Sequence, residues 1–163
     1  MKRLHILAAA ALASLAAAPI NAQMAPPPAP TSPSPDSPEL RAAKQEGAKR
    51  MISIMRKTWG DPEIGRILYI GWYSAAAAIC DDLEVDQAKL GKALAGVLGP
   101  DIEKASTDKA QHLASMLSLH VGMATGYVMA SHVQDGDRVC AQGREAMKDM
   151  PADKHLFRVA KAQ

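Results

Sequence analysis

The segment DKAQHLASMLSLHVGMATGYVMASHVQ, residues 108–134, is the most apolar of the helical stretches of this chain. Apolar side chains recur in it every three or four positions, a spacing that predicts one long α-helix. Its length would also suit a membrane span, but three histidines and several hydroxyl groups within one span make burial in lipid costly. We therefore expect a central helix buried on most sides. Its apolar stripe consists of Leu113, Leu117, Val121, Ala124 and Val128.

A second stripe of the same segment consists of small residues. Small side chains about four positions apart allow the backbone of a neighbouring helix to approach closely. The stripe is therefore expected to lie against a neighbouring backbone. It is formed by Ser115, Ser118, Gly122 and Gly126.

The residues before this segment carry local signals for three more helices. Ser37-Pro38-Glu39 reads as an N-cap, a proline at the first helical position and an acid in the first turn. Asp61-Pro62-Glu63 repeats this chemistry at the start of a second helix. Asp86 can cap a third helix, which Gly99-Pro100 ends.

The C-terminal part is expected to be helical as well. Asp135-Gly136-Asp137 turns the chain into a fifth helix, and a short tail helix is expected around residues 152–160. No segment alternates polar and apolar residues over the length of a strand, so no sheet is predicted. The predicted fold is all-α: one compact bundle of about five helices over residues 39–163, the size of one ordinary domain.

The N-terminus has the composition of an export signal. Lys2 and Arg3 precede a nearly uninterrupted apolar run, residues 4–18, which is too short to cross a membrane but typical of a secretory signal. Residues 20–22 then end in a small residue, Ala22, after which the signal is expected to be cleaved. Residues 1–22 are therefore predicted to be a signal peptide, and the chain is expected to be periplasmic or secreted.

Residues 23–38 are predicted to form a disordered, proline-rich linker, because prolines lack an N–H donor and favour extended geometry. It would act either as a passive tether or as a docking site for a partner that binds such segments. Loss of the signal lowers the 19 basic residues to 17, which equals the 17 acidic residues. Without a global positive field, neither nucleic acid nor an anionic membrane is an expected partner, and no transmembrane segment is predicted in the mature chain.

Cys80 and Cys140 are the only cysteines. In an exported protein such a pair normally forms a disulfide, whereas a reactive thiol pair would usually have CxxC spacing. Closing a loop of about 60 residues lowers the conformational entropy of the unfolded chain, which in the chain-entropy model stabilises the folded state by about 4 kcal/mol. We predict a Cys80–Cys140 disulfide that joins the end of the second helix to the start of the fifth.

This disulfide would gather carboxylates at one end of the domain, since it holds its two Cα atoms within about 6 Å. Several oxygens in one place could bind Ca²⁺. The favoured alternative is helix capping and surface ion pairing, for which Arg138 and Arg144 are available. The acidic cluster consists of Asp81, Asp82, Glu84, Asp86, Asp135 and Asp137.

His112, Met116 and His120 follow one another at i, i+4 spacing on the segment 108–134. In an exported protein, imidazole and thioether ligands on one helix face suit copper or could supply axial ligands to haem. Methionine and histidine at helical spacing also occur as ordinary core residues, because flexible methionines fill irregular gaps. The sequence thus leaves two interpretations of these residues, a copper or haem site and ordinary core packing.

The sequence contains none of the motifs CxxCH, GxSxG or HExxH, no P-loop and no glycine-rich dinucleotide fingerprint. This lowers the expectation of an enzyme without excluding one. The first hypothesis is a non-enzymatic exported helical protein that binds another protein of unknown identity or acts as a structural module.

Two resemblances add to this hypothesis. Residues 79–83, ICDDL, then a long uncharged helix and residues 140–145, CAQGRE, resemble small secreted two-cysteine all-helical proteins of alphaproteobacteria, which have no known function. Cys80-Asp81-Asp82 with Val85-Asp86 is also similar to the HdeA-type periplasmic acid-stress chaperones, although this chain is longer and its cysteines lie farther apart. The second likeness implies an acid-responsive chaperone.

Overall fold

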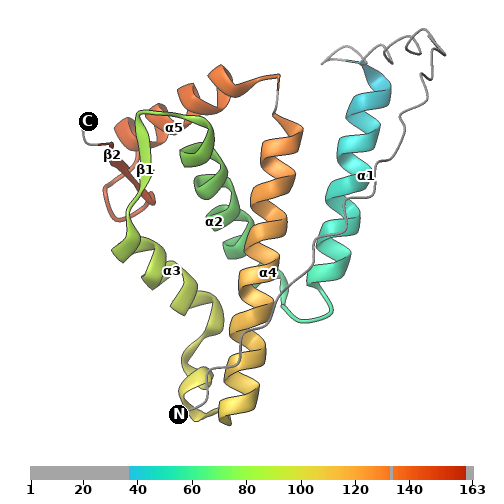
Figure 1. Cartoon of the computed structure of the whole chain (residues 1–163), viewed down its shortest axis with the longest axis vertical. Helices are drawn as coiled ribbons and strands as arrows, with labels where there is room; N and C mark the ends of the chain where they lie inside the picture. The colour runs from blue at the N-terminus through green and yellow to red at the C-terminus, as the bar shows by residue number, and fades with distance from the viewer. Residues whose placement is uncertain (1–36, 133, 161–163) are drawn as a thin grey trace, which may run out of the picture. The chain divides into compact units, whose positions relative to one another are not determined.

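The computed structural model describes residues 37–132 and 134–160 (Figure 1). The predicted signal peptide and nearly all of the predicted linker lie outside these residues. Helices dominate the described part, which confirms the predicted all-α bundle in its main elements. In chain order the elements are α1 (Pro38–Met55), α2 (Asp61–Ile79), β1 (Leu83–Val85), α3 (Gln87–Leu98), the short 3-10 helix η1 (Pro100–Lys104), α4 (Thr107–Ser131), α5 (Gly136–Asp149) and β2 (Phe157–Val159).

The starts of α1 and α3 follow the predicted local chemistry. The start of α2 does not, because its N-cap is Gly60, which makes no side-chain capping hydrogen bond, and Asp61 is its first helical residue. The Ser37 hydroxyl accepts a hydrogen bond from the backbone N–H of Leu40 at 3.1 Å and so caps α1. Asp86 caps α3 in the same way. Gly99 ends α3 with φ of 71°, a left-handed conformation that glycine adopts at little cost.

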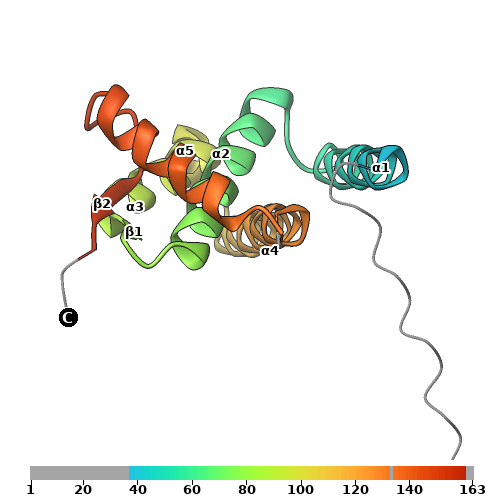
Figure 2. The same ribbon diagram turned by 90° about the horizontal axis from the view of Figure 1, so that it is seen from above.

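Helix α2 packs against α3, α4, α5 and β1, as the two views in Figures 1 and 2 show. Its crossing with α4 is close because Gly71 has no side chain. A Cβ atom on Gly71 would lie 3.1 Å from the backbone carbon of Ala124 and would press still more closely on the Ala124 side chain. The α2–α4 interface is therefore set by a glycine on α2. The largest fully buried side chains are Phe157, Met55, Ile67, Ile70, His120 and Val139.

The tail does not form the helix that we expected around residues 152–160. Residues 157–159 instead form β2, which pairs antiparallel with β1 in the register Leu83 to Val159 and Val85 to Phe157. Phe157 is 1% exposed and its ring contacts those of Trp72 and Tyr73. Burial of this ring and backbone pairing with β1 outweigh local helical preference, since strand formation depends strongly on tertiary context.

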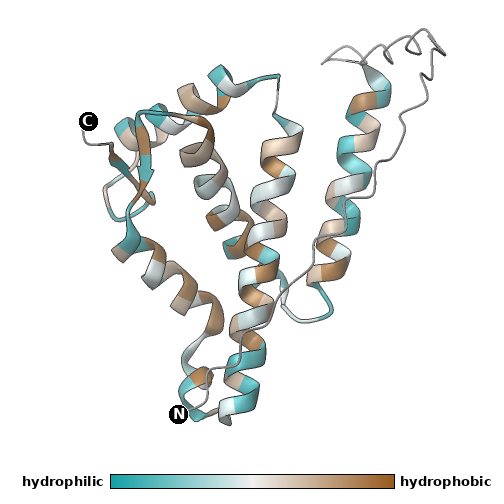
Figure 3. Cartoon of the chain, in the orientation of Figure 1, coloured by the Kyte–Doolittle hydropathy of each residue, from teal (hydrophilic) through white to brown (hydrophobic). Residues whose placement is uncertain are grey.

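Helix α4 is not buried on most sides, so that expectation is also wrong. Its inner face, formed by Leu117, His120 and Ala124, points into the core. Among the described residues α4 is the helix long and apolar enough to cross a membrane, yet only 17% of its most apolar window is buried. Figure 3 shows that pale and brown residues prevail along α4 beyond its first turns. One long side of the helix thus faces solvent.

The small-residue stripe lies on this exposed side. No heavy atom lies within 4 Å of a Cβ atom placed on Gly122 or Gly126, apart from the helix's own backbone and adjoining residues. Within the part of the chain that the structure describes, these two glycines of the stripe therefore do not meet a neighbouring backbone, contrary to our expectation. The close approach occurs on the inner face, where Ala124 meets Gly71.

Candidate functional site

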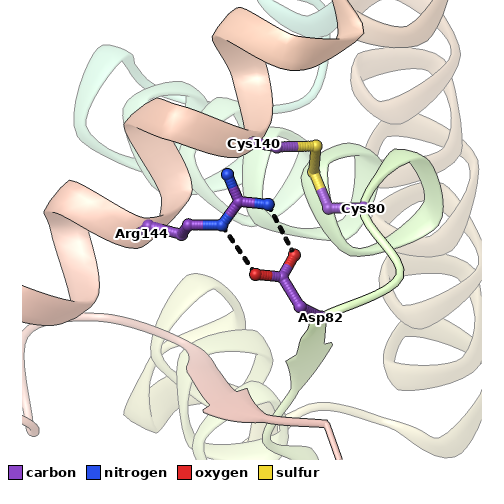
Figure 4. The surroundings of a disulfide bond; sticks show 4 residues. All are labelled: Cys80, Asp82, Cys140 and Arg144. Atoms are coloured by element: carbon purple, nitrogen blue, oxygen red, sulfur yellow. Dashed lines mark hydrogen bonds and ion pairs between the residues drawn. A yellow bond between two sulfur atoms is a disulfide. The ribbon is translucent and has the colours of Figure 1, made fainter.

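The predicted disulfide is present (Figure 4). The sulfur atoms of Cys80 and Cys140 are 2.03 Å apart and the Cα atoms 5.6 Å apart. Cys80 ends α2 and Cys140 lies in α5, so the bond joins the two helices that we expected. Such a bond indicates an oxidising, exported environment.

An ion pair lies next to the disulfide. The Arg144 guanidinium donates from Nε to Oδ2 of Asp82 at 2.6 Å and from Nη2 to Oδ1 at 3.2 Å (Figure 4). This two-point contact holds the pKa of the Asp82 carboxyl below its usual range. It ties α5 to the turn that follows Cys80 and so supports the same junction as the disulfide.

Other acids of the cluster have equally local roles. Arg158 pairs with Glu84 at 2.7 Å across the two strands, and Arg138 pairs with Asp135 at 3.0 Å. The Asp86 carboxylate accepts backbone N–H bonds from the first turn of α3, which lower its pKa. These contacts are the capping and ion pairing that we favoured from the sequence. Asp81 and Asp137 are exposed, and no group of three or more histidine, cysteine, aspartate or glutamate side chains in the described residues could hold a metal ion.

His120 lies in the core, where it has a specific partner. The indole Nε1–H of Trp59 donates a hydrogen bond to its Nδ1 at 2.9 Å, and the two rings meet edge to face. Burial lowers the pKa of His120 and so favours the neutral ring, as does the indole N–H, which can only donate to an unprotonated Nδ1. Because Nδ1 accepts this hydrogen bond, the proton of the neutral ring is on Nε2. That nitrogen is buried without a hydrogen-bond partner in the described structure.

The histidine and methionine line therefore does not form one site. His112 is exposed, Met116 is half-buried and His120 is fully buried. With Nδ1 engaged by Trp59, a metal at Nε2 would have to displace the remaining ring proton. This arrangement does not fit copper or haem ligation by His120, and the metal hypothesis stays a prediction without support from the geometry. The sequence carries no local signal for the contact between Trp59 and His120, which lie 61 positions apart.

The aromatic residues of α2 have a structural role. The ring of Tyr73 contacts those of Tyr69 and Trp72, and Trp72 and Tyr73 also contact Phe157 of β2. The Tyr69 hydroxyl donates to the backbone oxygen of Lys154 at 2.7 Å. These side chains hold the C-terminal segment against α2; Tyr69 is exposed and Trp72 is half-buried.

The remaining candidate site is the exposed side of α4, which we call the outer face. Charged residues usually cover the solvent side of a helix. Here no aspartate, glutamate, lysine or arginine occurs from Ala110 to Gln134. Leu119 is 55% exposed and Met129 39% exposed in the middle and near the end of this stretch. The outer face comprises Gln111, Ser115, Ser118, Leu119, Gly122, Gly126, Met129 and Ala130, all of which are exposed.

Comparison with family models, with curated proteins and with solved structures finds no match for this chain. The resemblances to small secreted two-cysteine proteins and to HdeA-type chaperones therefore stay predictions from the sequence. The outer face of α4 is singled out by its geometry and composition, because an exposed, uncharged helix face is a feature of interaction surfaces.

Proposed function

We propose that this chain is an exported, non-enzymatic helical protein, periplasmic or secreted, that binds another protein through the outer face of α4. The observation that carries the proposal is the exposure of a helix face without a single formal charge between Ala110 and Gln134. Burying exposed apolar surface such as that of Leu119 and Met129 gains roughly 25 cal/mol per Å². A face without charges is also desolvated at low cost.

The contacts around the disulfide support a structural rather than a chemical role for the charged groups there. Asp82, Glu84 and Asp86 hold α5, β2 and the start of α3 in place. The disulfide between α2 and α5 reinforces the same region. The rest of the domain then serves as a rigid support on which α4 presents its outer face.

Site-specific photo-cross-linking in living cells tests this proposal. A photoreactive amino acid replaces Ser118 on the outer face, and a matched variant carries it at Gly91, an exposed position on α3 where an added Cβ meets nothing within 4 Å. We expect a discrete protein adduct from position 118 and none from position 91. Equal adducts at both positions, or none at either, would contradict the proposal.

The export part has its own measurement. Mass spectrometry of the chain recovered from outside the cytoplasm should show an N-terminus at Gln23, the residue after the predicted signal. A chain that keeps Lys2 and Arg3 and stays in the cytoplasm would contradict export. It would leave the binding experiment unaffected.

A further inference from the structure

We infer that the protein bound at the outer face is a second copy of this chain, in an antiparallel pair of α4 helices whose two-fold axis passes near Gly122. This inference rests on the proposed function, for which it names the partner. In a two-fold contact the same surface faces itself, so it must be complementary to its own image. The outer face meets this condition in size, and charged residues beyond its two ends meet it in charge.

Size complementarity follows from the spacing. In an antiparallel pair centred on Gly122, residues equally far before and after it meet across the axis. Ser118 of one copy then lies opposite Gly126 of the other, and Ser115 opposite Met129. Leu119 falls beside the same Gly126. Each bulky side chain thus meets a small residue, and the open space around Gly122 and Gly126 leaves room for the second helix.

Charge complementarity decides the direction of the pair. Asp108 lies in the first turn of α4, on the same helix face as Gln111 and Ser115, and is exposed. Arg138 lies in the first turn of α5, just beyond the other end of α4, and is also exposed. An antiparallel pair brings Asp108 of each copy toward Arg138 of the other. A parallel pair would place the two Asp108 carboxylates side by side.

Arg138 can take part although it already contacts Asp135. That ion pair uses Nη2, at 3.0 Å, and a guanidinium has five N–H donors. The antiparallel arrangement also sets the positive end of each α4 helix against the negative end of the other. Both electrostatic effects favour the same orientation.

The composition of the outer face favours a second copy over a lipid surface. Helices that lie on membranes bury large apolar side chains and carry basic residues beside them. Here Ser115, Ser118 and Gly122 occupy the middle of the face, and its large apolar side chains are Leu119 and Met129, with no basic residue beside them. A close helix–helix contact uses small residues of this kind, whereas the membrane interface does not.

The area of the outer face determines how tightly the two copies are expected to bind. A helix of 25 residues is about 37 Å long and about 10 Å wide. One such face buries a few hundred Å² per copy, less than the roughly 800 Å² per partner of stable complexes. We therefore expect a reversible dimer with a dissociation constant in the range of roughly micromolar to hundreds of micromolar.

Sedimentation equilibrium of the full chain, produced in a host that processes export signals, tests the dimer over roughly micromolar to millimolar concentration. Gly122→Glu sets two carboxylates against each other at the axis and should weaken self-association at least about tenfold. Gly91→Glu is the matched control, since it adds the same side chain at an exposed α3 glycine with equally open surroundings. Equal thermal unfolding midpoints of the two variants exclude misfolding as the cause.

Cysteine cross-linking tests the orientation, because both native cysteines are already bonded. Under mild oxidation Gly122→Cys should give a covalent dimer. Ser115→Cys alone should not, whereas a mixture of Ser115→Cys and Met129→Cys chains should. A Ser115→Cys chain that cross-links to itself would overturn the antiparallel pair.

The outcomes separate the inference from the proposed function. A monomer at all concentrations, whose position 118 is cross-linked in cells to a different protein, overturns the inference and leaves the proposed function standing. A monomer that floats with phosphatidylethanolamine–phosphatidylglycerol vesicles, and no longer does so as Gly122→Glu, identifies a membrane surface and overturns both. A monomer with neither property also overturns both.

Discussion

The inner and outer faces of α4 belong to the same helix and both contain small, uncharged residues, yet they have opposite surroundings. On the inner face Ala124 presses against Gly71 of α2, and His120 is held by Trp59. On the outer face a Cβ atom placed on Gly122 or Gly126 would meet no other element of the described structure within 4 Å. Small residues therefore do not by themselves indicate close packing. The position of a matching gap on the neighbouring helix decides which face is buried.

The largest expected effect on the free energy of unfolding comes from removing the disulfide between α2 and α5. In the double variant Cys80→Ser/Cys140→Ser the unfolded chain regains the freedom of a loop of about 60 residues, so we expect about 4 kcal/mol less free energy of unfolding. Urea unfolding followed by circular dichroism measures it. If the loss is below about 1 kcal/mol, packing around α2 alone accounts for the stability and the disulfide is secondary.

The next effect contrasts the two faces directly. Gly71→Val places branched carbons against the α4 backbone and should cost up to about 3 kcal/mol, because neither helix can retreat without opening the core. Gly122→Val adds the same side chain in open space and should change the free energy of unfolding by less than about 0.5 kcal/mol. If the two variants lost the same free energy of unfolding in dilute, monomeric protein, the two faces of α4 would not differ in packing.

A smaller effect probes the hydrogen bond to His120. Trp59→Phe removes the donor and leaves the buried Nδ1 without a partner, at a cost of about 1–2 kcal/mol. The ¹⁵N shifts of the ring should show the Nε2-protonated form in the wild type and a mixture of tautomers in the variant. A wild-type ring protonated on Nδ1 would contradict the assigned hydrogen bond and reopen Nε2 as a metal ligand.

The smallest effect is a gradual loss of stability in acid. Burial lowers the pKa of His120, His132 and His155, so below about pH 6.5 the unfolded chain binds protons that the folded chain rejects. Stability should be full above that value and decline as the pH falls. The lowered pKa values of Asp82 and Asp86 add a second loss, which starts only below about pH 4.

Thermal unfolding midpoints between about pH 7.5 and about pH 3 measure both steps. A midpoint that stays constant down to about pH 5 would show that the histidines are not desolvated as the structure indicates. The second step lies where an acid-responsive chaperone would act. Protection of an aggregating client protein at that pH, absent at neutral pH, is the result that the HdeA-type hypothesis requires.

Most helix boundaries could be predicted because their signals are local. Ser37 and Asp86 cap their helices through N–H groups two or three residues away, and Gly99 ends α3 by its own conformation. The two strands could not be predicted, since each has three residues and its partner lies more than 70 residues away. A segment so short shows no alternation, and the burial of Phe157 depends on rings contributed by α2.

The same distinction between local and distant causes applies to the candidate site. The disulfide followed from a cysteine pair that had only one way to bond. The contact between Trp59 and His120 joins residues 61 positions apart, and nothing near either residue indicates it. The orientation of α4 was equally hidden, because both of its stripes are uncharged and the choice between them is made by Gly71.

The disulfide also fixes how the chain responds to a protease. Cys80 and Cys140 close a covalent ring that contains β1, α3, η1 and α4, whereas α1 lies outside it. One cut anywhere inside the ring opens the backbone but leaves both pieces attached, so the nick becomes visible on a gel only after reduction. One cut in the turn around Trp59, by contrast, separates α1 from the rest of the described domain, because no disulfide bridges that turn. The helix that carries the outer face thus belongs to the part of this protein that a first cleavage cannot release.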